Sequence, residues 1–113
     1  MPSPLSINII YNKQNTYGLK DDVQILERVF KTLSGKRTIH PPKLLDAREP
    51  LSPCDLQIHL EIPIYGAIPW AHANVILVNP EHWSYAFDEY VHAFDALLFR
   101  DATSAEQFRS DFK

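Results

Sequence analysis

Cysteine is almost absent from this sequence, since Cys54 is the single example in 113 residues. One cysteine excludes a disulfide framework and a cysteine zinc site within one chain. Neither a P-loop nor a G-x-G-x-x-G dinucleotide fingerprint is present. No apolar run approaches the roughly 20 residues that a membrane-spanning helix needs, and residues 1–6 (MPSPLS) lack the features of a signal peptide. We therefore expect a cytoplasmic protein without a membrane span.

A basic surface is also lacking, because 11 Lys and Arg residues stand against 14 Asp and Glu residues, giving a formal net charge of -3. Proteins that bind nucleic acids usually present a basic patch to the phosphate backbone, so we expect no nucleic-acid partner. With 113 residues, the chain is long enough for one hydrophobic core and too short for two nucleotide-binding halves. We expect a single domain over residues 1–113.

Runs of β-branched or alternating apolar residues predict five strands. They lie at residues 6–11, 37–45, 56–62, 75–78 and 96–99. The second of these runs is broken by Pro41 and Pro42, which favours a position near the edge of a sheet. Residues 63–71 are too short and too rich in turn residues for a long helix, so they predict a loop with one helical turn.

Helical patterns separate several of these strands. Apolar residues at three- and four-residue spacing predict a helix that Asp21 or Asp22 caps and Gly35 ends. Aromatic residues at the same spacing in 81–94 predict a helical connection, and Thr103 or Ser104 is expected to cap a closing helix. Strands that alternate with helices are typical of an α/β layered fold with a mostly parallel sheet.

Four segments, in order, carry a resemblance to a known family. They are GLKDDVQILERVF, LQIHLEIP, ANVILVNPEHW and ALLFRDATSAEQF. Together they resemble the N-terminal, Rossmann-like half of a GT-B glycosyltransferase of the family 1/4-like group, whose members show a glycine-led helix start, Leu-Glu and Asn-Pro-Glu strand ends, and a late strand followed by Lys-Thr. The resemblance implies a Rossmann-like three-layer sandwich with a mostly parallel five-stranded sheet. Arg100 and Asp101 stand where the family carries Lys-Thr, which keeps one cation.

The resemblance also implies a location for a binding site. We expect the first and fourth strands to be adjacent in the middle of the sheet, with the second and third strands on one side. The strand order then reverses between the first and fourth strands, and ligands lie outside the carboxyl ends of these strands. The loop after the first strand and the cluster that follows the fourth would then flank one crevice, with Gly18 and Asn79 on opposite sides. The candidate substrate-binding residues are Asn15, Tyr17, Gly18, Glu61, Asn79, Glu81, His82, Trp83 and Arg100. Such amide, carboxylate, imidazole and aromatic groups suit a sugar acceptor.

Each candidate also has a structural interpretation. Asn79 and Pro80 can simply end a strand, and Glu81 can stabilise the first turn of a helix. Trp83 can belong to the core, and Gly18 can serve a tight loop. Only the shared location of the candidates at two neighbouring strand ends favours a functional site.

Other chemistries find less support. Glu89 and His92 have the Glu-x-x-His spacing of di-iron bundles, but such sites need two copies on four long helices, so we predict no metal. Cys54 has no base near it in sequence. A flavodoxin- or receiver-like domain is a further alternative, although a receiver needs acidic residues at the end of the first strand, where residues 12–14 read Asn-Lys-Gln.

The resemblance implies the acceptor-side half of an enzyme that transfers sugar from a nucleotide sugar, with no permanently bound cofactor and no identified catalytic base. A GT-B enzyme needs a second domain to hold the donor, so we expect no turnover of sugar nucleotides by this chain alone. The alternative is a non-catalytic module that binds a glycan or pairs with another domain or chain.

Overall fold

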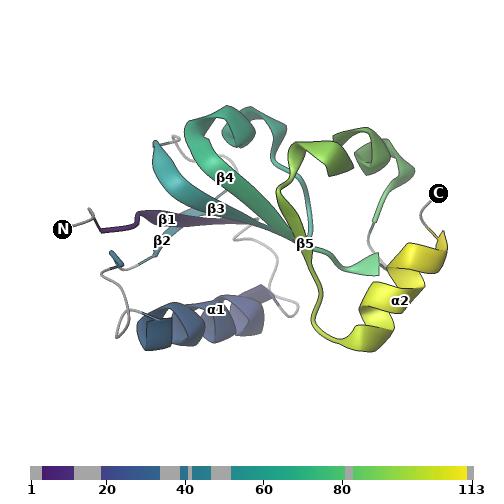
Figure 1. Ribbon diagram of the computed structural model, residues 1–113, viewed down its shortest axis with the longest axis horizontal. Coiled ribbons are helices and arrows are strands. Elements are labelled where there is room, and N and C mark those ends of the chain that lie inside the picture. The colour runs from purple at the N-terminus through teal and green to yellow at the C-terminus, as the bar shows by residue number, and fades with distance from the viewer. Residues whose placement is uncertain are drawn as a thin grey trace.

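One parallel sheet organises the protein, and the computed structural model describes residues 4–11, 19–33, 39–40, 42–46, 52–80 and 83–111. The strands are β1 (Ile7–Tyr11), β2 (Lys43–Asp46), β3 (Cys54–Leu60), β4 (Ala71–Leu77) and β5 (Ala96–Leu98). Every pair of neighbouring strands is parallel (Figure 1). The predicted Rossmann-like α/β fold with a mostly parallel five-stranded sheet is confirmed.

The order of the strands differs from the prediction. The sheet runs β2-β1-β3-β4-β5. The expectation that the first and fourth strands are adjacent is therefore wrong, and so is the placement of the second and third strands on one side, because β2 and β3 flank β1. This is the flavodoxin-like order, in which the direction of strand addition reverses between β1 and β3. β2 lies at one edge of the sheet, which confirms the edge position predicted from Pro41 and Pro42. The more fully buried strands β1 and β3 pair with each other inside the sheet.

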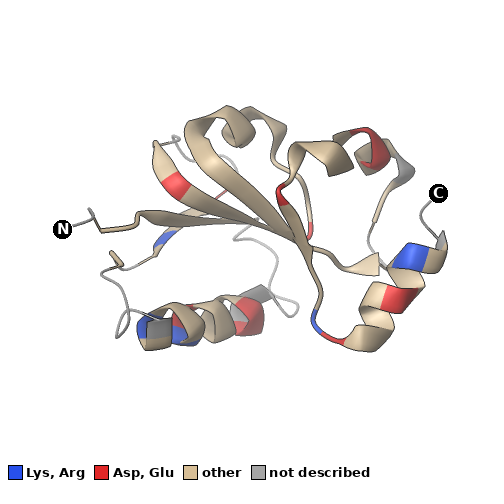
Figure 2. Cartoon of the chain, in the orientation of Figure 1, with Lys and Arg blue, Asp and Glu red and all other residues tan. Residues whose placement is uncertain are grey.

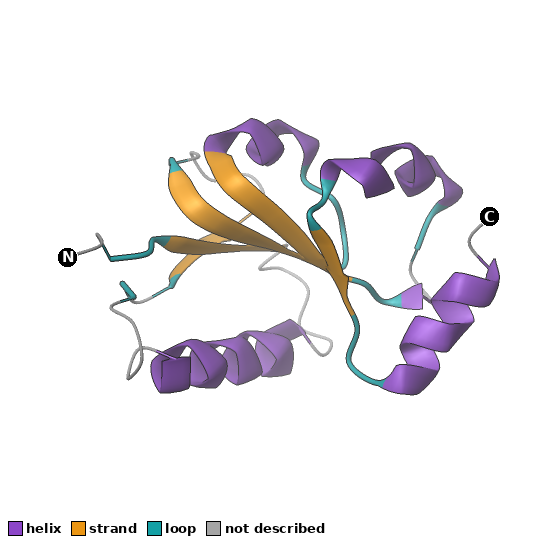
Figure 3. Cartoon of the chain, viewed as in Figure 1, coloured by secondary structure: helices purple, strands orange, loops and turns teal. Residues whose placement is uncertain are grey.

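Helices cover both faces of the sheet. Figure 3 shows α1 (Leu19–Leu33) below the strands, with the 3₁₀ helices η1 (Tyr65–Trp70) and η3 (Tyr85–Ala93) above them. The closing helix α2 (Ala102–Asp111) contributes Phe108, which packs in the same cluster as Phe94. The helical turn predicted within 63–71 and the helical connection predicted after β4 are therefore both present.

Several boundaries differ from the sequence-based expectations. The helix α1 begins at Leu19, so Asp21 and Asp22 lie in its first turn and do not cap it. The cap of α2 is Asp101, whose Oδ1 accepts from the backbone N–H of Ser104 at 2.7 Å, so Thr103 and Ser104 are inside the helix. The strand β4 begins at Ala71 rather than at residue 75, because its first residues pair with β3 despite their weak hydrophobicity.

The core lies on both faces of the sheet. One cluster, between the sheet and α1, joins Ile9, Val23, Phe30, Ile58 and Leu77, among others. The other face holds a cluster of Ile76, Val78, Phe94 and Phe108 and a smaller one around Ile10. Leu77 is buried, whereas Val75, Leu97 and Phe99 are partly buried and pack against these clusters.

Leu77 and Leu98 offer a matched test of this core, because they are register partners in β4 and β5. Leu77→Ala removes buried side-chain atoms and should lower the free energy of unfolding by about 2–5 kcal/mol. Leu98→Ala, at a residue that is 36% exposed, should cost less than about 1 kcal/mol. Urea unfolding of both variants measures the difference, and equal losses would contradict the described packing.

Candidate functional site

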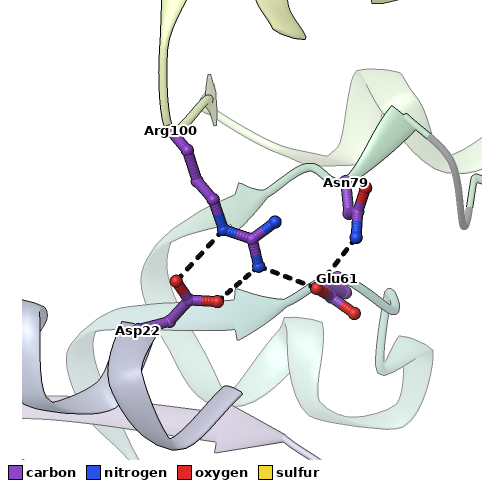
Figure 4. Close-up of polar contacts among 4 residues, drawn as sticks. All are labelled: Asp22, Glu61, Asn79 and Arg100. Carbon is purple, nitrogen blue, oxygen red and sulfur yellow. Dashed lines mark hydrogen bonds and ion pairs between the residues drawn. The ribbon is translucent and has the colours of Figure 1, made fainter. Parts of the chain in front are cut away.

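Four polar residues meet at the carboxyl ends of the strands (Figure 4). The Arg100 guanidinium, just after β5, donates from Nε to Asp22 Oδ1 at 3.1 Å and from Nη2 to Asp22 Oδ2 at 2.5 Å. The same Nη2 donates to Glu61 Oε1 at 2.8 Å, and Asn79 Nδ2 donates to that oxygen at 3.2 Å. These bonds form the Arg100 cluster, which joins α1 to the ends of β3, β4 and β5.

Burial strengthens the ion pairs of the Arg100 cluster. The side chains of Asp22 and Glu61 are largely buried, and the Arg100 side chain is 38% exposed. The hydrogen bonds to Asp22, opposed by partial desolvation and supported by Glu61, raise the pKa of the Arg100 guanidinium above its usual value. Figure 2 shows that most charged residues lie on the helices and near strand ends, while the strands are mostly uncharged. The cluster therefore concentrates buried charge at the carboxyl ends of the strands, which we call the carboxyl edge of the sheet.

Glu61 has an unusual backbone conformation. Its φ of 68° is the one positive value recorded for a non-glycine residue in the described part of the chain. Side chains other than glycine adopt this left-handed region at a cost, unless surrounding contacts fix them there. Here the Glu61 N–H donates to the Leu77 carbonyl at 2.9 Å, and its carboxylate binds Arg100 and Asn79. The contacts on both backbone and side chain hold the residue in place.

The Arg100 cluster has the chemistry of an internal clamp. A general acid or base must exchange a proton with a substrate. Asp22 instead accepts two bonds from one guanidinium, and Glu61 shares an oxygen between a cation and an amide. In this arrangement both carboxylates are bound by groups of the protein itself. The geometry therefore favours a structural link between four elements over proton transfer.

The sequence-predicted site residues have different outcomes. Glu61, Asn79 and Arg100 come together, as their positions at strand ends indicate. Trp83 has a packing role, as its structural interpretation proposed. Its indole N–H donates to Asp88 at 2.7 Å, and its ring packs edge-on against Phe108. Asn15, Tyr17, Gly18, Glu81 and His82 lie outside the described residues, as does the expected crevice between Gly18 and Asn79.

The strand order also moves the expected crevice. The topological switch point lies between β1 and β3, so the argument that placed it between the first and fourth strands is wrong. Asp22, the main partner of Arg100, was expected only as a helix cap. The three charged residues of the cluster lie at positions 22, 61 and 100, and no spacing rule joins residues so far apart. Placement of Glu61 and Arg100 at strand ends is the one signal that the sequence offers.

A second polar group lies buried on the face of the sheet opposite α1. His59 Nδ1 accepts from the backbone N–H of Ile64 at 3.0 Å, so Nε2 carries the proton and donates to Asn74 Oδ1 at 3.1 Å. Asn74 Nδ2 donates to the Ile68 carbonyl at 2.9 Å, and Gln57 Nε2 donates to the Ala67 carbonyl at 2.8 Å. This network fixes η1 against β3 and β4. These hydrogen bonds allow Gln57 and His59, the polar side chains on one face of β3, to be buried.

An open pocket of about 490 Å³ lies at the amino ends of the strands, where β3 and β4 begin. Cys54 and Ala71 are register partners there, and Ser6 comes from the residue before β1. The remaining lining residues are Pro53, Asp55, Pro69, Trp70 and His72. We call this the amino-edge pocket. It combines an exposed aromatic ring with a carboxylate, an imidazole and a hydroxyl group.

Two features limit the chemistry of the amino-edge pocket. Burial raises the pKa of the Cys54 thiol, which disfavours the thiolate that a nucleophile needs. Ser6 Oγ donates to Asp55 Oδ2 at 3.1 Å and accepts from the Asp55 backbone N–H at 3.0 Å, so this hydroxyl group is held between two groups of one residue. The pocket is suited to binding rather than to covalent catalysis.

Comparisons with known proteins do not assign this chain to a family. No protein-family model matches this chain, and no curated protein or solved structure matches it. Among the described residues, no three His, Cys, Asp or Glu side chains are grouped so that they could hold a metal ion. No helix in the same part of the chain has the length and apolar character needed to cross a membrane.

Removing the cation tests the Arg100 cluster. Arg100→Met leaves two largely buried carboxylates without their cation, and we expect a loss of about 2 kcal/mol in the free energy of unfolding, below the roughly 3–5 kcal/mol of a fully buried pair. Arg109→Met, which removes an exposed ion pair with Glu106, should cost less than about 0.5 kcal/mol. Chemical denaturation measures both values, and similar losses would contradict the clamp.

His59 should make stability depend on pH. Burial lowers its pKa from 6.5 to about 4, so the unfolded chain binds a proton at a higher pH than the folded protein does. Stability from neutral His59 is complete above pH 6.5 and is lost as the pH falls toward 4, by roughly 3 kcal/mol in total. Across this pH range, the free energy of unfolding should change less in His59→Gln than in the unaltered protein. The control His72→Gln keeps His59 and should show the same change as the unaltered protein. An unchanged profile in His59→Gln would refute the assignment.

Proposed function

We propose that this chain is a non-catalytic module that binds a neutral saccharide in the amino-edge pocket. The observation that carries the proposal is Trp70, whose side chain lines the pocket and is 44% exposed. An exposed indole gives up the hydrophobic gain of burial, so a ligand that covers its face restores that gain. The CH groups on one side of a pyranose ring provide such a surface.

Polar groups around Trp70 supply the remaining recognition. Asp55 accepts hydrogen bonds, the imidazole of His72 donates and accepts them, and both line the same pocket as the indole. Sugar hydroxyls both donate and accept, so they match this set. The volume of about 490 Å³ lies within the range of roughly 300–1,000 Å³ that small-molecule sites occupy. A mono- or disaccharide unit therefore suits its size and chemistry.

The charges of the lining favour a neutral sugar over a nucleotide sugar. Among the residues that the structure describes, no Lys or Arg lines the amino-edge pocket, and Asp55 contributes a carboxylate. Phosphate groups are usually bound by cations or by the N–H groups of a helix start, and a nearby carboxylate repels them. The diphosphate of a sugar nucleotide would meet no compensating charge from these side chains.

The glycosyltransferase interpretation has less support than the binding module. Its acceptor crevice depended on adjacent first and fourth strands, whereas β3 lies between β1 and β4. Its described polar candidates Glu61, Asn79 and Arg100 bind one another. Sugar transfer from a nucleotide sugar, completed by a second domain, stays a prediction of the resemblance. The flavodoxin-like strand order gives no function by itself, because one fold supports many activities.

Titration with neutral mono- and oligosaccharides, followed by calorimetry, tests the proposal. We expect saturable binding that Trp70→Ala weakens by at least about 10-fold, because the aromatic contact is lost. Tyr65→Ala is the matched control, since Tyr65 is an exposed aromatic residue outside the pocket lining, and it should bind like the unaltered protein. UDP- and GDP-sugars should bind no better than the free sugars and should yield no free nucleotide. Failure of every neutral saccharide to bind would refute the proposal.

A further inference from the structure

Three hydrogen bonds from buried side chains connect η1, and the residue before it, to the sheet. His59 Nδ1 accepts from the backbone N–H of Ile64, which directly precedes η1, at 3.0 Å. Gln57 and Asn74 donate to two backbone carbonyls of η1, at 2.8 and 2.9 Å. All three side chains are buried, and those of His59 and Gln57 have no exposed surface. These polar side chains therefore hold η1 on the sheet.

The other contacts of η1 are limited. Ala67 is its one buried residue among those described, and Ile68 is partly buried. Tyr65 stacks on Tyr90 of η3 with ring centroids 3.7 Å apart, yet Tyr65 is 39% exposed. The residue before η1 provides no side-chain cap, and Pro69 has no backbone N–H to donate. A short helix with so little burial depends on the three bonds from the sheet.

The bond at His59 Nδ1 exists only while this nitrogen carries no proton. A backbone N–H can only donate, so the N–H of Ile64 requires an acceptor at Nδ1. Nε2 already carries a proton and donates to Asn74 Oδ1 at 3.1 Å. A second proton on the ring goes to Nδ1, where it faces the N–H of Ile64. Protonation thus replaces a hydrogen bond by two opposed donors in a site without exposed surface, which is a costly arrangement.

We propose that protonation of His59 releases η1 from the sheet and thereby weakens ligand binding in the amino-edge pocket, a regulation that rests on the proposed saccharide binding. η1 ends at Trp70 and leads directly into β4 (Figure 3). Release of η1 therefore displaces the indole from Asp55 and His72, which line the pocket on β3 and β4. The coupling is reciprocal, because a saccharide that needs Trp70 in place also favours neutral His59.

The direction of the pH effect follows from burial. Burial lowers the pKa of His59 from 6.5 to about 4 while η1 is in place, and the bond with Asn74 opposes this effect. Release of η1 admits water, so the pKa returns toward 6.5. The released form binds the proton more tightly, and its population grows as the pH falls from 6.5 toward 4. Release also hydrates Gln57 Oε1, a buried oxygen that accepts no hydrogen bond from a described residue.

No charged side chain of the described residues binds the His59 ring. Its remaining ring contact is the edge of Phe94, with centroids 4.9 Å apart. Asp95, which follows Phe94, accepts from the backbone N–H of Asn74 at 2.8 Å. Other titratable groups on the surrounding elements are exposed or bind other partners, and they are Asp55, Glu61, Tyr65, His72, Asp88, Glu89 and His92. Protonation of His59 is therefore the change that acts on η1 directly.

Amide hydrogen exchange, followed by NMR without ligand between pH 7 and pH 4.5, tests the release of η1. The two pKa values of His59 allow the ratio of released to closed protein to rise by up to roughly 50-fold over this range. We expect the protection of the Ile64 and Ala67 amides to fall by at least about 10-fold. The amides of Ile9 and Ile10 in β1 report global unfolding and should stay protected. In His59→Gln, which has no titrating ring, protection of Ile64 should change by less than about 2-fold.

Calorimetry with a neutral saccharide tests the effect on the pocket. The apparent affinity of the unaltered protein should fall by at least about 3-fold at pH 4.5, because only closed molecules bind. His59→Gln retains Asp55 and His72, so it shares any direct effect of pH on the pocket lining and should lose only the part that His59 causes. His72→Gln retains His59 and should keep that part.

Three results would overturn the proposal. The first is protection of Ile64 that stays constant with pH, and the second is protection that is lost together with that of Ile9, which shows global unfolding. Both comparisons use the unaltered protein and remain decisive if His59→Gln fails to fold. The third is saccharide binding with the same pH dependence in His59→Gln and the unaltered protein, which leaves the proposed function standing. If no saccharide binds at any pH, the proposed function fails and the control of affinity fails with it, whereas hydrogen exchange still decides whether η1 is released.

Discussion

The ion pair between Arg100 and Asp22 is the interaction on which the carboxyl edge of the protein depends. It connects the first turn of α1 with the end of β5, 78 positions later in the chain, and Glu61 and Asn79 extend it across β3 and β4. Because the carboxylates are largely buried, each needs its partner to avoid a large desolvation cost. The bonds also hold the left-handed backbone at Glu61. One guanidinium therefore fixes the relative positions of four elements.

This clamp has a consequence for function. Parallel α/β folds usually bind ligands at the carboxyl ends of their strands, where helices diverge. Here the polar side chains described at that edge satisfy one another, and an exposed indole lies in a pocket at the opposite edge. The network of Gln57, His59 and Asn74 holds η1, and η1 ends at Trp70. The buried network thus positions the residue that we propose contacts a saccharide.

The sequence predicted the fold class well because hydrophobic periodicity reports burial directly. All five strands and the helices between them were found, with boundaries displaced by a few residues. Strand order was not predictable, because the pairing of β1 with β3 is decided by burial and by the edge character of β2 rather than by any local pattern. Gln57 and His59 alternate with apolar residues along β3, and the pattern alone does not show that both are buried and hydrogen bonded. Local rules give the element, and tertiary contacts decide its environment.

The same limit applies to the sites. Positions at strand ends indicated Glu61, Asn79 and Arg100, whereas Asp22 was hidden within a helical pattern. Trp70 follows a proline in a segment that reads as a loop, and only the structure reveals its exposure beside Asp55 and His72.

The central claim is that ligand recognition lies at the amino edge of the sheet while the carboxyl edge is closed by internal ion pairs. Mapping of amide and indole chemical shifts by ¹H–¹⁵N NMR during titration with a neutral oligosaccharide tests it most directly. The account predicts shifts at the Trp70 indole and at residues 54, 55, 71 and 72, with the signals of Glu61, Asn79 and Arg100 unchanged. Shifts that concentrate at Glu61, Asn79 and Arg100 and spare Trp70 would contradict it.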